Sequence, residues 1–115
     1  MRSGMIYKQG EILIVPFPFS DLSSVKQRPV LVLSKSSELK NTEDIITCGI
    51  TSHLKDTRHS ILIENNNLEK GSIPIQSRIK VDKLFTLDRR IVRKKVARIN
   101  KETFDKVKSE FINLV

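Results

Sequence analysis

Short apolar runs separated by polar turns recur along the chain, and most have the length and β-branched content of strands. The first two, Ile12–Val15 and Val30–Leu33, flank a segment rich in proline, serine and aspartate, which favours a loop. Loops held on buried strands are common places for binding and catalysis. The predicted strands are Glu11–Phe17, Pro29–Lys35, Ile45–Thr51, Ser60–Glu64, Ile73–Ile75, Ile79–Leu87 and Val92–Ile99. This spacing predicts a mainly β barrel or sandwich.

Polar clusters between the runs predict the turns. Ser36–Glu43 and Asn65–Ser72 are rich in turn-forming residues. Within Ile79–Leu87 the apolar alternation breaks near Asp82–Lys83, which predicts a bend or bulge in that strand.

The C-terminal residues follow a helical period instead. Asn100 is suited to cap a helix, and Glu102 would lie in its first turn. The helix is expected to pack on the sheet and plug the barrel, with packing against a second subunit as the alternative. Its apolar positions are Phe104, Val107, Phe111, Leu114 and Val115.

Length and composition predict one small domain with an aliphatic core. The chain has 115 residues, 38% of them hydrophobic and none of them Trp. The domain is expected to span residues 5–115, with residues 1–4 vector-derived or preceding an alternative start at Met5. Cys48 is the sole cysteine, so an internal disulfide is excluded. No apolar run approaches the roughly 20 residues that span a bilayer, and a cytoplasmic location without membrane association is expected.

Positive charge is concentrated in one segment. The formal net charge is +8, and residues 78–98 contain nine Lys or Arg and two Asp, which gives +7. Such local basicity favours a polyanionic partner, either nucleic acid or an acidic protein. A solvated, lysine-rich strand face is the alternative.

Arg28 and Thr51 are the first candidates for chemistry. Arg28 precedes a proline and a core strand, and its guanidinium could bind a phosphate. A structural salt bridge to Asp21 or Glu11 is the alternative. Thr51 ends a predicted strand, where its hydroxyl could donate to a phosphate oxygen or simply cap the strand.

His53 and His59 are candidates for proton transfer, although lone histidines often have no such role. Their spacing matches no metal motif, and no glycine-rich phosphate loop is present, so no metal or other cofactor is expected.

Two further groups could contact nucleic acid. Phe17 and Phe19 could stack on unpaired bases or plug the barrel. Gln76, Ser77 and Arg78 could read base edges or line a groove, and a kinked edge strand is the alternative.

Several ordered segments resemble the MazF/PemK toxins of bacterial type II toxin–antitoxin modules. These segments are the G-E-I-L-I-V-P-F-P-F-S-D-L opening, the K-x-R-P-V-L-V-L-S strand, I-T-S at residues 50–52, and S-R-I-K-V-D-K-L-F-T-L-D at residues 77–88. Each is weak alone, but their order and spacing are specific, and the resemblance covers nearly the whole chain from Met5.

The resemblance implies an SH3-like β-barrel with a C-terminal α-helix, usually as a homodimer. It implies a metal-independent endoribonuclease that cuts single-stranded RNA, leaving a 2′,3′-cyclic phosphate and a 5′-OH. Arg28 and Thr51 match the family's catalytic arginine and threonine. The residues expected to contact RNA are Phe17, Phe19, Ser20, Asp21, Lys26, Ser52, His53, Gln76, Ser77 and Arg78.

The resemblance leaves the general base open. Some family members use an acidic residue just before the strand that starts near Ser77, where this chain has Pro74 and Gln76. Glu11, Asp21 and His53 remain candidates. A cognate antitoxin with an acidic tail is also implied. The competing functions are a toxin of related fold that inhibits a protein such as gyrase, and a plain nucleic-acid-binding barrel.

Overall fold

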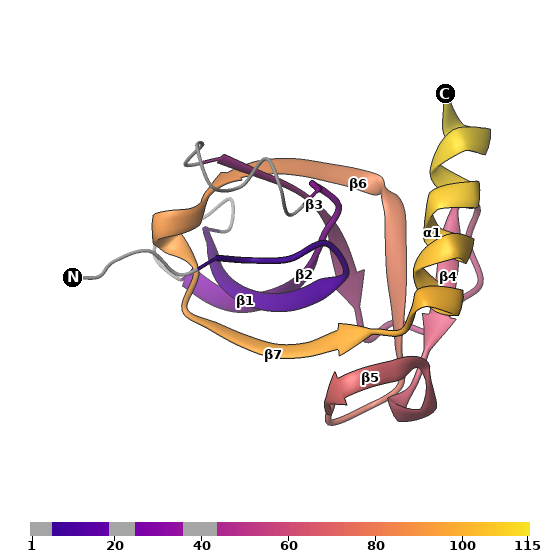
Figure 1. The fold of residues 1–115 in the computed structure, drawn as a ribbon, viewed down its shortest axis with the longest axis horizontal. Coiled ribbons are helices and arrows are strands. Elements are labelled where there is room, and N and C mark those ends of the chain that lie inside the picture. Colours follow the sequence, from indigo (N-terminus) through magenta and orange to yellow (C-terminus); the bar gives the residue numbers. More distant parts are fainter. Residues whose placement is uncertain (1–5, 19–24, 36–43) are drawn as a thin grey trace.

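In the computed structural model, which describes residues 6–18, 25–35 and 44–115, seven antiparallel strands form one curled sheet that is followed by a helix (Figure 1). The strand order is β4-β6-β3-β2-β1-β7-β5. This confirms the mainly β, SH3-like barrel with a C-terminal helix. The elements are β1 (Glu11–Pro18), β2 (Val25–Val32), β3 (Asp44–Thr51), β4 (Ser60–Ile63), η2 (Asn65–Asn67), β5 (Leu68–Gly71), β6 (Ser77–Asp88), η3 (Arg89–Ile91), β7 (Lys94–Ile99) and α1 (Lys101–Leu114).

The central strands β1 and β2 are buried on both faces. Ile12 and Leu31 lie opposite each other and pack into the larger core, which also holds Cys48. Leu13 and Val30, the next opposed pair, pack into a second core. Burial on both faces explains why these strands appear as continuous apolar runs rather than as alternating patterns.

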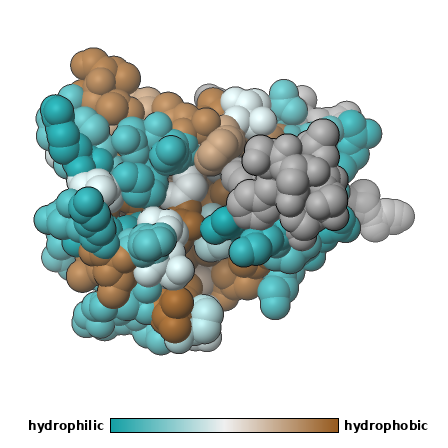
Figure 2. Space-filling view, turned by 180° about the vertical axis from the view of Figure 1, so that it is seen from behind, coloured by the Kyte–Doolittle hydropathy of each residue, from teal (hydrophilic) through white to brown (hydrophobic). Residues whose placement is uncertain are grey.

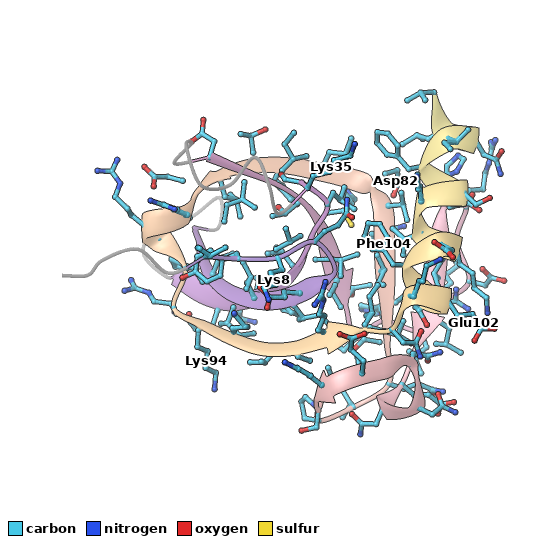
Figure 3. All side chains as sticks on the ribbon, in the orientation of Figure 1. Lys8, Lys35, Asp82, Lys94, Glu102 and Phe104 are labelled. Atoms are coloured by element: carbon cyan, nitrogen blue, oxygen red, sulfur yellow. The ribbon has the colours of Figure 1, made fainter. Side chains whose placement is uncertain are left out.

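Strand β6 bends sharply, as the sequence predicted. Its register with β3 shifts between Cys48, which lies opposite Leu84, and Gly49, which lies opposite Lys80. The unpaired residues therefore include Asp82 and Lys83. Figure 1 shows β6 turning there from one side of the barrel to run beside β4, and Figure 3 labels Asp82 at the turn.

The helix α1 covers β4 and β6 and is capped as expected. The Asn100 side chain accepts a hydrogen bond from the backbone N–H of Thr103 at 2.9 Å. Val107 is fully buried, and Phe104 packs against the larger core between α1 and β6 (Figure 3). The predicted apolar stripe is wrong at its end, because Val115 is 87% exposed. Among the described residues, no helix is long and apolar enough to cross a membrane.

Three strand predictions require correction. Strand β2 begins at Val25 rather than at Pro29, because Lys26 and Gln27 pair with β1 although their side chains are exposed. The predicted strand Ile73–Ile75 is irregular. Strand β5 lies instead within the predicted turn Asn65–Ser72. The apolar pattern does not predict this edge strand, because it pairs with β7 through its backbone and buries little apolar surface.

Candidate active site

Arg28 and Thr51 line the same cavity, although 23 positions separate them in the sequence. Arg28 lies within β2, opposite Val15 of β1, and Thr51 is the last residue of β3. Pairing of β2 with β3 places the two strands side by side. The cavity has a volume of about 580 Å³, and we call it the Arg28–Thr51 cavity. It is lined by Arg28, Pro29, Gly49, Ile50, Thr51, His53, Lys55, Thr57, Lys80, Lys83 and Phe85.

The Thr51 hydroxyl is oriented by the turn that follows it. Its Oγ1 accepts a hydrogen bond from the backbone N–H of His53 at 3.1 Å. Because the oxygen acts as an acceptor in this bond, its own hydrogen remains available to a further acceptor. His53 is exposed and lines the same cavity. The turn therefore brings a hydroxyl donor and an imidazole together beside Arg28.

Strand β6 anchors the loop 52–59, which forms one wall of the cavity. Arg78 Nε donates to the carbonyl of Leu54 and its Nη1 donates to Ser60 Oγ, both at 3.1 Å. Lys80 Nζ donates to Thr57 Oγ1 at 2.6 Å. These bonds hold the loop at Leu54 and Thr57, and the residue that follows it at Ser60, to the strand opposite Thr51.

The helix α1 holds the far end of this loop. His59 Nδ1 lies 2.9 Å from Glu110 Oε1, and the His59 carbonyl accepts from the backbone N–H of Val81. His59 has a φ of +58°, so the chain turns tightly at this residue. His59 is thus a structural link between the loop and α1, and it does not line the cavity.

A second concavity shares Arg28, Pro29 and Ile50 with the first. It has a volume of about 690 Å³ and continues along β1, β7 and the segment that precedes β6. We call it the Ile73 groove, since Ile73 lies in its wall. Ser52, Ser77, Lys94 and Lys95 also line it. Figure 3 shows Lys94 extending away from β7.

The proposed RNA-contacting residues occupy several places. Ser52 lines the Ile73 groove and His53 lines the Arg28–Thr51 cavity. Lys26 is exposed on β2. Ser77 is buried and its hydroxyl donates to the carbonyl of Ile75 at 3.1 Å. Gln76 is exposed beside a third, smaller hollow.

Part of the first loop cannot be assigned a place. Phe19, Ser20 and Asp21 lie outside the described residues, and only the backbone of Phe17 is described, in β1.

Glu11 does not line the Arg28–Thr51 cavity. It is buried in β1, where Oε2 lies 3.0 Å from Lys95 Nζ and Oε1 accepts from the backbone N–H of Lys8. Within residues 6–18, 25–35 and 44–115, no group of three or more His, Cys, Asp or Glu side chains is placed to hold a metal ion.

Comparison with known proteins identifies the family. A profile described as the PemK-like, MazF-like toxin of type II toxin–antitoxin systems matches residues 8–115. The chain belongs to this family. Among curated protein sequences no match is found.

Solved structures of MazF and of mycobacterial endoribonucleases share the toxin's fold. MazE–MazF from Deinococcus radiodurans (crystal form II) has a TM-score of 0.80 at 18% identity, with 96% of each chain covered. An endoribonuclease from a mycobacterial species has a TM-score of 0.74 at 14% identity, over 95% of this chain and 90% of that one. A mycobacterial endoribonuclease in complex with its cognate antitoxin has a TM-score of 0.73 at 15% identity, over 93% of this chain and 92% of that one.

In the folded toxin the basic segment 78–98 does not form one surface. Lys80 and Lys83 of β6 face the Arg28–Thr51 cavity, whereas Lys94 and Lys95 of β7 line the Ile73 groove. These strands lie on opposite sides of the central strands (Figure 1). The segment therefore supplies cations to two adjoining concavities. Seen from behind, the surface interleaves polar and apolar areas (Figure 2).

The sequence did not assign Lys55, Thr57 or Phe85 to the site, and it indicated Lys80 and Lys83 only as members of the basic segment 78–98. Lys55 and Thr57 lie within six positions of Thr51 in the sequence, and this short separation would have been enough to predict that they lie near it. Lys80, Lys83 and Phe85 come from β6, and the pairing of β6 with β3 brings them to the cavity that Thr51 also lines.

Proposed function

We propose that this toxin is a metal-independent endoribonuclease that cuts single-stranded RNA at the Arg28–Thr51 cavity. The observation that carries the proposal is the meeting of a guanidinium, a hydroxyl and an imidazole in one cavity that cationic side chains surround. Endoribonucleases with this fold support the same reaction class.

In the proposed reaction the ribose 2′-oxygen attacks the adjacent phosphorus. A new P–O2′ bond forms, the P–O5′ bond breaks, and the products are a 2′,3′-cyclic phosphate and a 5′-OH. Negative charge develops on the non-bridging oxygens during the attack. Arg28 neutralises that charge, and the Thr51 hydroxyl donates to the same phosphate. Preorganised donors of this kind contribute about 2.7–4 kcal/mol each to lowering the barrier.

His53 is our candidate for the group that accepts the proton of the 2′-OH. It lines the cavity with Thr51, and a neutral imidazole has a ring nitrogen that can accept a proton. Glu11 is engaged by Lys95 outside the cavity, and Gln76 cannot exchange a proton. The 5′-oxygen leaves from the side of the phosphate opposite the 2′-oxygen and takes up a proton there from water.

The proposed function also implies protein partners. We propose that the toxin acts in the cytoplasm as a homodimer and that a cognate acidic antitoxin neutralises it. The Deinococcus MazE–MazF complex and the mycobacterial complex with an antitoxin support such a partner. The lysines that line the two concavities, among them Lys83 and Lys94, would bind RNA phosphates and an acidic antitoxin segment alike, so antitoxin and RNA would compete.

The test is cleavage of a purified long RNA by the purified toxin in the presence of EDTA, with analysis of the product ends. We expect cleavage with 2′,3′-cyclic phosphate and 5′-OH ends, and no cleavage when the RNA is replaced by DNA. Thr51→Ala should lower the single-turnover rate about 100-fold with little change in RNA affinity. Binding without cleavage would favour the nucleic-acid-binding barrel, and absence of both would favour an inhibitor of a protein target.

A further inference from the structure

A third hollow adjoins the Ile73 groove and differs from it in charge. It has a volume of about 300 Å³ and shares Ile73, Pro74 and Ile75 with the groove. Its other lining residues are Glu64, Asn65, Asn66 and Gln76. We call it the Asn66 hollow. Each of the three concavities thus shares lining residues with the next, from Thr51 to η2.

Two of the three consecutive asparagines fix the shape of the hollow. Asn65 Oδ1 accepts from the backbone N–H of Ile73 at 2.8 Å, and this bond ties the irregular segment before β6 to η2. Asn67 Oδ1 accepts from the backbone N–H of Glu64 at 2.8 Å, and its Nδ2 donates to Thr103. The walls of the hollow are therefore held in place before any ligand binds.

The remaining amides are available to a ligand. Asn66 and Gln76 are both exposed, and in the described part of the chain no hydrogen bond to protein engages either side-chain amide. Each amide offers donors and an acceptor. The sequence predicts Asn65–Asn67 only as part of a turn and gives no signal for a role of Asn66.

The charge of the lining selects the kind of group that fits. The Arg28–Thr51 cavity and the Ile73 groove contain Arg or Lys side chains, whereas the one charged residue that lines the Asn66 hollow is Glu64. A carboxylate without a lining cation disfavours a phosphate. Pro74 and Ile75, the latter 57% exposed, present an apolar surface on which a flat ring can pack.

We propose that the Asn66 hollow is a base-recognition subsite that takes one unpaired base of the RNA, with adenine preferred. An Asn or Gln amide can form a bidentate pair with the N6 and N7 atoms of adenine, and a carboxylate accepts from an exocyclic amino group. Uracil has no such amino group. The subsite rests on the proposed function, because the RNA strand that fills it is the one whose phosphate lies at Arg28.

The experiment measures binding separately from cleavage. Fluorescent single-stranded 2′-O-methyl oligoribonucleotides, which lack the attacking hydroxyl, carry one variable base in a uridine background at each position in turn. Affinity is measured for the wild type, Asn66→Ala, Gln76→Ala and the control Asn113→Ala, whose exposed position on α1 lies outside all three concavities.

We expect the wild type and Asn113→Ala to prefer adenine over uracil at one position by roughly tenfold. Asn66→Ala and Gln76→Ala should each abolish most of that preference and leave the affinity for oligouridine within about twofold. No preference in the wild type, or a preference that both variants retain, would overturn the subsite. Cleavage of unmodified RNA is assayed alongside: a preference without cleavage rejects the proposed function alone, and cleavage with an unchanged preference rejects the subsite alone.

Discussion

Replacing Arg78 by alanine should slow RNA cleavage much more than it weakens RNA binding. The sequence assigns Arg78 to RNA contact, but in the fold its side chain is only 12% exposed, and it donates to Leu54 within the loop 52–59 and to Ser60, the first residue of β4 after that loop. We therefore expect Arg78 to act by positioning the loop that carries His53 into the Arg28–Thr51 cavity.

The structure sets the size of the effect. Hydrogen bonds from a charged donor contribute about 1.5–3 kcal/mol each. The Asp56 partner is 83% exposed, so its ion pair at 3.4 Å adds little. Of the bonds to Leu54 and Ser60, only the one to Leu54 lies within the loop, since Ser60 is already paired in β4. A single such bond of about 1.5–3 kcal/mol corresponds to roughly a 10- to 100-fold change in the anchored fraction of the loop. Because Lys80 and His59 still hold the loop, we expect a 10- to 100-fold lower rate.

The assay compares Arg78→Ala with Lys83→Ala, an exposed lysine of the same cavity. Single-turnover cleavage gives the rate, and binding of 2′-O-methyl RNA at several salt concentrations gives the affinity and its salt dependence. Arg78→Ala should lower the rate and leave the salt slope unchanged. Lys83→Ala should reduce that slope by about one with little effect on the rate at saturating enzyme.

The opposite pattern would refute the positioning role of Arg78. If Arg78→Ala kept the wild-type rate and lost one unit of salt slope, the guanidinium would contact a phosphate directly. Thermal melting of each variant checks that the barrel is intact.

Two further predictions concern stability. Asn100→Ala removes the cap of α1 and should lower the free energy of unfolding by about 1 kcal/mol and the melting temperature by about 4 °C. The control Asn113→Ala should not lower the melting temperature. Equal melting temperatures of the two variants would show that the cap does not stabilise the fold. Burial raises the pKa of the Cys48 thiol from about 9 to about 12, so above pH 9 the unfolded state releases a proton that the folded state keeps. The stability advantage of the wild type over Cys48→Ala, measured by urea unfolding, should therefore shrink by roughly 2 kcal/mol between pH 8.5 and 10.5, and a constant difference would contradict this.

The elements with buried apolar faces were predictable from the sequence, because burial leaves a periodic pattern. The runs at β1 and β3, the bend at Asp82–Lys83 and the cap at Asn100 are confirmed. The start of β2 and the edge strand β5 were not predictable in this way. Their pairing depends on backbone hydrogen bonds, and side chains such as those of Lys26 and Gln27 remain exposed as they would in a loop.

The candidate site shows a similar division. The order of the family's motifs picked out Arg28 and Thr51, and strand pairing brings them to one cavity. The sequence did not indicate that Arg78 holds a loop or that Asn66 faces a hollow. Both properties depend on which side chains the register of β6 and the turn at η2 bring together, and such contacts leave no periodic signal in one chain.

Primer-extension mapping of cuts in one long RNA tests whether the toxin cleaves RNA through Arg28. Wild type and Arg28→Ala are compared side by side, and the product ends are identified. We expect discrete cuts by the wild type that leave 2′,3′-cyclic phosphate and 5′-OH ends. Arg28→Ala, once thermal melting has shown that it is folded, should cut at least 100-fold more slowly at the same positions. Cutting by Arg28→Ala at the wild-type rate would show that Arg28 takes no part in the reaction.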